Sequence, residues 1–388
     1  MARIDAILQL VREQGASDLH MTTGAPPIVR INGEITPIPY EQITREINEL
    51  LLFELMDDEL RRRYEEFKDV DFSYEVPGVV RARCNIYEQS RGVAGAFRIL
   101  PNAVLTLEQL GVPAHVERLS ELHRGLVLVT GPPGTGKSST LASMVDHINR
   151  GFRRHILTIE DPIEFRHDNI QSLVTQREVG RHTPSFERGL HAALREDPDV
   201  ILVGELRDPE SMSLALTAAA TGQLVFGTLH TMSAAQTVDR ILDTFEGERQ
   251  TQVRLMLSEC LKGVLAQRLL RRADGRGRVL ALEILVGNNA VASLIREKKT
   301  FQLPSVIQTG KREGMQTMDE SVLGLVRAGV VTVEEAALHV SSRDLLPVGG
   351  VQAAAAAPRP AAPAAPPAAV PRPPAPLGFP PAPRPTQS

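Results

Sequence analysis

The chain has 388 residues, of which 42% are hydrophobic and 23% are charged, and its formal net charge is -4. This length provides material for about two or three globular domains. The net negative charge argues against a general nucleic-acid-binding protein, because affinity for a polyanion comes mostly from Lys and Arg.

Cysteine and apolar patterning narrow the class further. The cysteines, Cys84 and Cys260, form no CxxC pair, which argues against a zinc site and a disulfide framework and is typical of a reducing cytoplasm. No uninterrupted apolar run approaches the ~20 residues of a membrane-spanning helix, and the N-terminus lacks a signal-like apolar segment. We therefore expect a cytoplasmic protein that is neither secreted nor membrane-spanning.

The N-terminal part of the chain predicts a small α+β domain over residues 1–104. Residues 7–15, ILQLVREQG, have the pattern of an amphipathic helix that stops at Gly15. The stretches 27–38, 69–89 and 92–100 contain short alternating runs, and the first contains an Asn-Gly turn. These features are typical of an antiparallel sheet. A linker with a short helix is predicted over residues 105–121.

The middle of the chain alternates between apolar runs and helical stretches. The runs occupy residues 125–131, 155–161, 200–206 and 224–230. Strands that are buried on both faces and joined by helices predict a parallel, doubly wound sheet. We therefore predict an α/β core with C-terminal helices over residues 122–345, whose ligand binds at the carboxyl ends of the strands.

Composition changes abruptly near Leu346. Of the 28 prolines, 13 follow Val351, among many alanines and no acidic residue. Proline interrupts helix and sheet hydrogen bonding, and alanine offers little side chain for a core. We predict a disordered, partly polyproline-II tail over residues 346–388 that acts as a spacer, with partner binding as the alternative.

The first apolar run leads into GPPGTGKSS, residues 131–139, which fits the P-loop pattern G-x-x-x-x-G-K-[ST] between a strand and a helix. The expected nucleotide-binding residues are Gly131, Gly134, Thr135, Gly136, Lys137, Ser138 and Ser139. The glycines let backbone N–H groups approach phosphate oxygens. Lys137 would reach the β and γ phosphates, and the Ser138 hydroxyl would bind Mg²⁺. The motif thus predicts binding of a nucleoside triphosphate.

Acidic residues and a histidine follow the other apolar runs at the same sheet edge. Glu160 and Asp161 end the second run, Glu205 lies near the end of the third, and His230 ends the fourth. We predict that these three acids and Ser138 shape a Mg²⁺ site, formed by Ser138, Glu160, Asp161 and Glu205. We also predict that His230 senses the phosphate. For Asp161 the alternative is a helix cap or loop salt bridge, and for His230 it is satisfaction of backbone groups at a strand end.

Glu164, in the loop after the second run, is predicted to polarise the attacking water of phosphoryl transfer. Asp199 is the weaker metal candidate, because it precedes the third run and lies ~20 Å from the phosphate edge at ~3.3 Å per residue.

These motifs, in this order, resemble those of the PilT-type secretion ATPases, the family of type IV pilus retraction motors. The resemblance covers residues 15–35, 80–100, 131–140, 158–165, 200–208, 217–231 and 307–338. It implies a PAS-like N-terminal domain and a RecA-like core in a homohexameric, ATP-hydrolysing ring that drives pilus retraction and twitching motility. It further implies action on an inner-membrane platform protein of the pilus machinery, peripheral association with that membrane, and no direct nucleic-acid binding.

Arginines of the N-terminal part fit such a ring. Arg81 and Arg83 are two apart on a predicted strand and therefore face the same side, and Arg98 lies nearby in the hairpin order. We expect no anionic partner in register with them, so they suit a triphosphate held between domains or subunits. Arg240 is a weaker candidate for the same task. The alternative is a solvated basic face.

The chain departs from the family pattern at two places. The first histidine of the family's His box is Gln223 here, and the Arg and Asn of the family's C-terminal signature are Ala292 and Ser293. Gln223 can form hydrogen bonds but cannot become a cation. Loss of the signature residues favours weaker coupling to retraction, so an accessory retraction paralogue remains an alternative.

Other functions are possible for this kind of core. A pilus-assembly or type II secretion ATPase commonly has a four-cysteine zinc module, which two cysteines cannot form. A nucleic-acid translocase needs a basic, aromatic channel, whereas tryptophan is absent and aromatics make up 4% of the chain. A noncatalytic nucleotide-binding scaffold would result if the acids failed to align.

Overall fold

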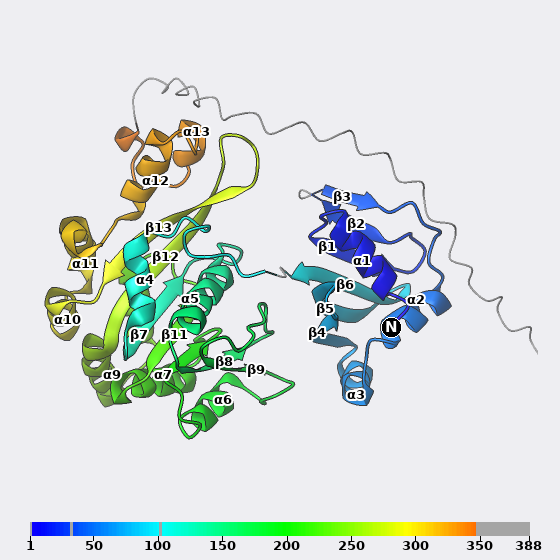
Figure 1. Cartoon of the computed structure of the whole chain (residues 1–388), viewed down its shortest axis with the longest axis horizontal. Coiled ribbons are helices and arrows are strands. Elements are labelled where there is room, and N and C mark those ends of the chain that lie inside the picture. The colour runs from blue at the N-terminus through cyan, green and yellow to red at the C-terminus, as the bar shows by residue number, and fades with distance from the viewer. Residues whose placement is uncertain (1, 32–33, 101–102, 347–388) are drawn as a thin grey trace, which may run out of the picture. The chain divides into compact units, whose positions relative to one another are not determined.

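A computed structural model describes residues 2–31, 34–100 and 103–346, and Figure 1 shows their helices and strands. The predicted Asn-Gly turn at residues 32–33 and the predicted tail after Leu346 lie outside the described residues. No helix in the described part of the chain is long and apolar enough to cross a membrane.

A six-stranded sheet organises the N-terminal region (Figure 1). Its strands are β1 (Asp18–Thr22), β2 (Ile28–Ile31), β3 (Glu34–Pro37), β4 (Asp69–Val76), β5 (Val80–Gln89) and β6 (Gly92–Leu100). They lie in the order β3-β2-β1-β6-β5-β4, and every neighbouring pair is antiparallel. The predicted antiparallel sheet is therefore confirmed, and β1 joins it as a strand that the alternating runs did not indicate.

Three helices accompany this sheet: α1 (Asp5–Glu13), α2 (Arg45–Phe53) and α3 (Asp58–Phe67). The helix predicted to stop at Gly15 is α1, which buries Leu8 and Val11. Helices α2 and α3 were missed, although Thr44 and Asp57 cap their first turns in the way that marks a helix start. Apolar residues of the helices and of alternate sheet positions form one core.

Alternation along β5 separates this core from a polar face. Ala82, Cys84 and Ile86 are buried among the helices and strands of the N-terminal core. Arg81 and Arg83 occupy the alternate positions of the strand and therefore project from the other face of the sheet. That polar face carries the arginines considered for the candidate site.

A seven-stranded sheet forms the centre of the remaining chain. Its strands are β7 (Gly125–Thr130), β8 (His155–Glu160), β9 (Leu173–Glu178), β10 (Val200–Val203), β11 (Leu224–Leu229), β12 (Leu261–Arg271) and β13 (Arg278–Val286). The order is β13-β12-β7-β11-β10-β8-β9, and all neighbours are parallel except β12 and β13. The four apolar runs are β7, β8, β10 and β11, so the predicted parallel sheet is confirmed. Strands β9, β12 and β13 were not predicted.

Helices cover both faces of this sheet, as a doubly wound fold requires. The helices are α4 (Ala114–Glu121), α5 (Lys137–Gly151), α6 (Phe186–Ala193), α7 (Pro209–Thr221), α8 (Ala234–Asp243) and α9 (Gly247–Cys260). Val127 and Val129 of β7 share a core with α4 and α5, whereas Leu126 and Leu128 share another with α6 to α9. The segment predicted as a linker contains α4 and contributes Leu107 to the first of these cores.

The C-terminal helices are α10 (Asn289–Arg296), α11 (Leu303–Thr309), α12 (Met318–Arg327) and α13 (Val333–Ala336). Val322 and Val326 of α12 pack with Leu270 of β12 and Ala281 of β13. The predicted class, an α+β N-terminal domain with a doubly wound P-loop core and C-terminal helices, is confirmed.

Candidate functional site

The phosphate-binding loop lies between β7, which ends at Thr130, and α5, which begins at Lys137. Gly131, Gly134 and Gly136 have positive φ values of 142°, 78° and 87°. A Cβ on Gly131 would come within 2.6 Å of a backbone oxygen of β12, so any side chain at this position would clash with that strand. Gly136 is the N-cap of α5 and provides no side-chain cap. The helix start therefore offers N–H groups that suit a phosphate.

Lys137 already lies across this loop. Its Nζ donates to the carbonyl oxygens of Gly131 at 2.8 Å and Pro132 at 3.1 Å, and lies 3.5 Å from Nδ1 of His230. Burial lowers the pKa of Lys137, against the opposing charges of Glu205 and Glu164. Neutral carbonyls are weaker partners for an ammonium than phosphate oxygens are. Lys137 is thus held beside the loop, where its ammonium group can bind a phosphate in place of the carbonyl oxygens.

Glu205 and His230 meet at the ends of β10 and β11, as the sequence predicts. Oε1 of Glu205 lies 2.9 Å from Nε2 of His230 and 2.6 Å from Nε of Arg207. Burial alone would raise the pKa of Glu205, but the hydrogen bond from Arg207 and the charges of both partners hold it below its ordinary value. The result is a continuous polar chain from Lys137 through His230 and Glu205 to Arg207.

Arg207 was not identified from the sequence. Its position two residues after Glu205, still at the sheet edge, is the signal that could have found it. The hydrogen bond with Glu205 is the largest cause that raises the pKa of Arg207, and burial opposes it. The charge of Asp161 raises this pKa further.

Glu160 is the last residue of β8 and is turned toward polar neighbours. Its Oε1 accepts hydrogen bonds from Thr158 at 2.6 Å and from Nε2 of Gln176 at 3.1 Å. Burial raises the pKa of Glu160 to about 7, aided by the charge of Glu164 and opposed by these hydrogen bonds. The pKa of this carboxyl group therefore lies close to neutral pH.

Within the described residues, no group of three or more His, Cys, Asp or Glu side chains could hold a metal ion alone. Magnesium commonly keeps several waters and binds proteins through one or two oxygens plus substrate phosphates. Ser138, in the first turn of α5, and Glu205 have the oxygen chemistry for such a site. The metal roles of Glu160 and Asp161 stay predictions.

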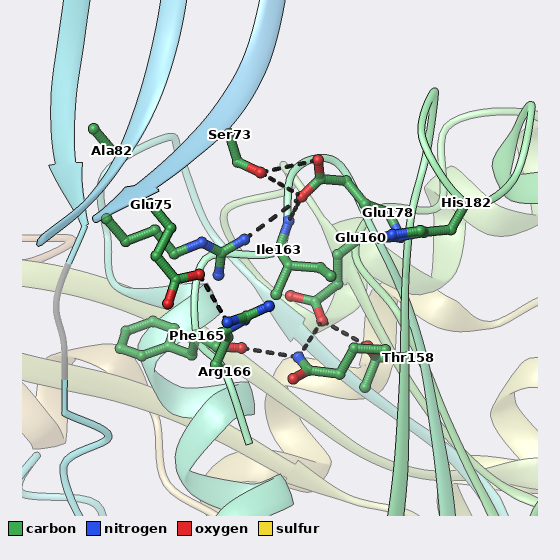
Figure 2. Close-up of polar contacts among 12 residues, drawn as sticks. Ser73, Glu75, Ala82, Thr158, Glu160, Ile163, Phe165, Arg166, Glu178 and His182 are labelled. Atoms are coloured by element: carbon green, nitrogen blue, oxygen red, sulfur yellow. Dashed lines mark hydrogen bonds and ion pairs between the residues drawn. The ribbon is translucent and has the colours of Figure 1, made fainter. Parts of the chain in front are cut away.

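The loop that carries Glu164 is anchored by two side chains of β9 (Figure 2). Ile163 donates its backbone N–H to Oε2 of Glu178 at 3.1 Å, and Gln176 donates to the carbonyl oxygen of Phe165 at 2.8 Å. These contacts flank Glu164, whose charge contributes to the pKa values of Lys137 and Glu160. Sequence reasoning missed both anchors, because the polar run LVTQRE of β9 does not resemble a buried parallel strand.

The N-terminal arginines have acidic partners, so the expectation of none in register was wrong. Arg81 lies 3.6 Å from Glu178, Arg83 lies 3.6 Å from Asp71, and Arg98 lies 3.0 Å from Asp18. In the sheet register Glu75 is directly opposite Arg81 and Asp18 is directly opposite Arg98. Pairing between strands determines these neighbours, and the alternation within one strand does not reveal them. A role for these arginines at a nucleotide remains a prediction.

Arg83 and Arg98 are directly opposite each other in neighbouring strands, which confirms that the arginines share a region of the sheet. Arg240 is exposed near the end of α8, and its catalytic role also stays a prediction. Asp199 precedes β10 and accepts a hydrogen bond from the backbone of His155, the first residue of β8. Its predicted place away from the phosphate edge is confirmed.

The two departures from the family pattern lie elsewhere. Gln223 directly precedes β11, at the opposite end from His230, and its Oε1 accepts a hydrogen bond from Thr221 at 3.1 Å. Ser293, which follows Ala292 in α10, accepts a hydrogen bond from Arg296 at 3.2 Å. Neither position contributes a side-chain contact to the phosphate loop.

Comparison with known proteins identifies the family. The Type II/IV secretion system protein family matches residues 2–338. The chain belongs to this family. Among Type II/IV secretion system proteins, the type IV pilus retraction ATPase PilT of Pseudomonas aeruginosa is 51% identical over 333 residues, covering 86% of this chain and 96% of that protein. A twitching motility protein of Neisseria gonorrhoeae is 50% identical over 337 residues, covering 85% and 89%.

The crystal structure of the pilus retraction motor PilT with bound ADP has the same fold. It matches with a TM-score of 0.83 and 46% sequence identity, and the match covers 89% of this chain and 99% of that chain.

Proposed function

We propose that this chain is an ATPase motor that hydrolyses ATP to ADP and phosphate and thereby drives retraction of a type IV pilus, the basis of twitching motility. The observation that carries this proposal is the 51% identity to a pilus retraction ATPase over 96% of that protein. The preformed phosphate loop and the polar chain from Lys137 to Arg207 support it independently.

The residues divide the chemistry according to their positions. The loop glycines and the start of α5 bind the phosphates, and Lys137 exchanges its carbonyl partners for phosphate oxygens. Ser138 and Glu205 would hold Mg²⁺, which would supply charge neutralisation at the phosphates. Glu164 orients and polarises the attacking water, and His230, paired with Glu205, reports on the γ phosphate.

The proposal includes a homohexamer, in which an N-terminal arginine of one protomer reaches the nucleotide of its neighbour. Arg83 and Arg98 are exposed and suit this task. Arg83 would break only a surface ion pair with Asp71, whereas Arg98 would leave the partly buried Asp18. The motor acts from the cytoplasm on an inner-membrane platform protein of the pilus machinery, without binding nucleic acid.

An accessory retraction motor is the second candidate. Ala292 and Ser293 replace the Arg and Asn of the signature in α10, which removes a long cationic side chain from that helix. Such a change would weaken the coupling of hydrolysis to retraction while leaving ATP turnover intact. A pilus-assembly or secretion motor is a third reading of the same core.

A deletion strain separates these readings. Surplus surface pili together with lost twitching would support a principal retraction motor, whereas bald cells would indicate assembly. Unchanged twitching would favour the accessory role. Phosphate release by the purified full-length chain, measured with and without Mg²⁺, tests the ATPase activity itself, and its absence would overturn the proposal.

A further inference from the structure

The backbone on each side of Glu164 is tied to β9. Ile163 donates its N–H to Oε2 of Glu178 at 3.1 Å, while Gln176 bonds to Phe165 at 2.8 Å and accepts from the N–H of His167 at 2.9 Å. Gln176 and Glu178 are two apart on the strand and therefore project to the same side. The position of Glu164 thus depends on what holds these two side chains.

Glu178 is shared with the polar face of the N-terminal sheet (Figure 2). The hydroxyl of Ser73 on β4 lies 3.0 Å from Oε1 and 3.1 Å from Oε2 of Glu178, and Nη2 of Arg81 on β5 lies 3.6 Å from Oε2. A second tie joins Glu75 of β4 to Arg166, at 2.8 Å. The loop of Glu164 is therefore linked to the N-terminal sheet at its beginning through Glu178 and at its end directly through Arg166.

Because Glu178 is buried, its carboxylate depends on the contacts with the N-terminal sheet. Glu178 is only 5% exposed, and a buried carboxylate is costly unless hydrogen bonds and an opposite charge compensate it. Ser73 and Arg81 supply that compensation from the N-terminal sheet, and Ile163 supplies it from the loop. A shift of the N-terminal sheet would remove Ser73 and Arg81 from Glu178, so Glu178 would have to reorient and the Ile163 N–H would lose its acceptor.

We propose that Glu178 is a positioning residue that couples the N-terminal sheet to Glu164. Through it, the placement of β4 and β5 determines whether the water-activating loop is held in its working position. This inference rests on the proposed ATPase function for its catalytic consequence, but the mechanical coupling stands on the contacts alone.

Two nearly isosteric variants of the full-length chain test the coupling. Glu178→Gln removes the charge that faces Arg81, and Ser73→Ala removes a hydroxyl of the N-terminal sheet while leaving the bond between Glu178 and Ile163. Tyr74→Phe is the matched control, because Tyr74 also lies on β4 and its hydroxyl donates to a carboxylate, that of Asp5, at 2.7 Å. The measurements are kcat and KM for ATP, and hydrogen–deuterium exchange of residues 161–167.

Both test variants should lower kcat by about 10-fold, since small misplacement of a catalytic group is costly, and leave KM for ATP within about 2-fold. Exchange of residues 161–167 should accelerate in both variants and stay unchanged in Tyr74→Phe. In a Glu164→Gln background, Glu178→Gln should lower kcat by less than about 2-fold, because its effect passes through Glu164.

If Glu178→Gln lowered kcat by the full factor of about 10 in the Glu164→Gln background as well, Glu178 would act independently of Glu164. That result would overturn the catalytic coupling. Unchanged exchange of residues 161–167 in Ser73→Ala would overturn the mechanical coupling. If the unmodified chain released no phosphate, the proposed function would fail, yet the exchange comparison would still decide whether the N-terminal sheet holds the loop.

Discussion

The phosphate loop and the arginine-bearing face of the N-terminal sheet differ in how their cations are paired. Lys137 donates to neutral backbone carbonyls, whereas Arg81, Arg83 and Arg98 each face a carboxylate. The loop is therefore prepared for an anion by one chain alone. An arginine of the N-terminal sheet can reach a phosphate only by leaving a carboxylate, which makes its contribution conditional on assembly.

The three arginines also differ among themselves. Arg83 and Arg98 are exposed, and the surface ion pair of Arg83 with Asp71 is worth about 0 to 1 kcal/mol, so its exchange for a phosphate costs little. Asp18 is partly buried, so release of Arg98 costs more than release of Arg83. Arg81 is buried and faces the buried Glu178, and breaking such a pair leaves an uncompensated charge. Arg83 and Arg98 are thus the better candidates to move, and Arg81 is better suited to hold Glu178.

The largest effect is expected at the prepared loop. Lys137→Ala should reduce ATP turnover by at least about 10³-fold, because the phosphate charge loses its fixed cation. Phosphate release by the purified chain checks this, with Lys299→Ala as the control, since the Lys299 side chain pairs with Glu297 at the surface. Near-normal turnover in Lys137→Ala would contradict the proposed cradle.

Mixed protomers test whether the arginine face works between subunits. An arginine supplied by a neighbour is worth about 10³-fold or more in turnover, so Arg98→Ala or Arg83→Ala should lose activity on that scale if it acts in this way. Mixing the deficient variant with Lys137→Ala protomers should then restore part of the turnover, because each supplies what the other lacks.

Arg312→Ala serves as the control for that experiment, because Arg312 belongs to the C-terminal helical region and not to the N-terminal sheet. Absence of any recovery on mixing, with both variants assembled, would show that the arginines act within their own protomer or not at all.

The sequence predicted the phosphate loop far better than it predicted the arginine-bearing face of the N-terminal sheet. The P-loop and the acids at strand ends follow local rules, so Lys137, Glu205 and His230 were found and their convergence is confirmed. The acidic partners of the arginines depend on strand register, and Glu178 lies on a polar strand, β9, that carries no apolar signal. Contacts between segments distant in sequence were therefore the part that sequence patterns did not reveal.

Glu164→Gln tests the element that joins the two regions. Nucleotide binding should be retained, because the phosphate loop is unchanged, while phosphate release should slow by about 10²-fold as general-base assistance is lost. Binding of a fluorescent ATP analogue and single-turnover phosphate release measure the two steps separately. Asp168→Asn is the control within the same segment. A loss of binding alone would move the water-activating role elsewhere, with Glu205 as the first alternative.

The smallest effect is expected at Glu160, in the pH dependence of stability without nucleotide. Burial raises the pKa of Glu160 to about 7, from an ordinary value of 4.5. Between these values the folded chain binds more protons than the unfolded chain, so the free energy of unfolding falls as pH rises. Above pH 7 the cost of a charged, partly buried Glu160 is complete and is on the order of 3 kcal/mol.

Glu160→Gln removes that cost and keeps an acceptor for Thr158 and Gln176. The variant should therefore unfold at higher denaturant than the unmodified chain at pH 8. The difference should shrink as pH falls from about 7 to 4.5 and approach zero below that range, where Glu160 is protonated in both states. Glu66→Gln, at an exposed position of α3, is the control and should show no such trend. A difference independent of pH would mean that packing or hydrogen bonding, and not the charge of Glu160, accounts for it.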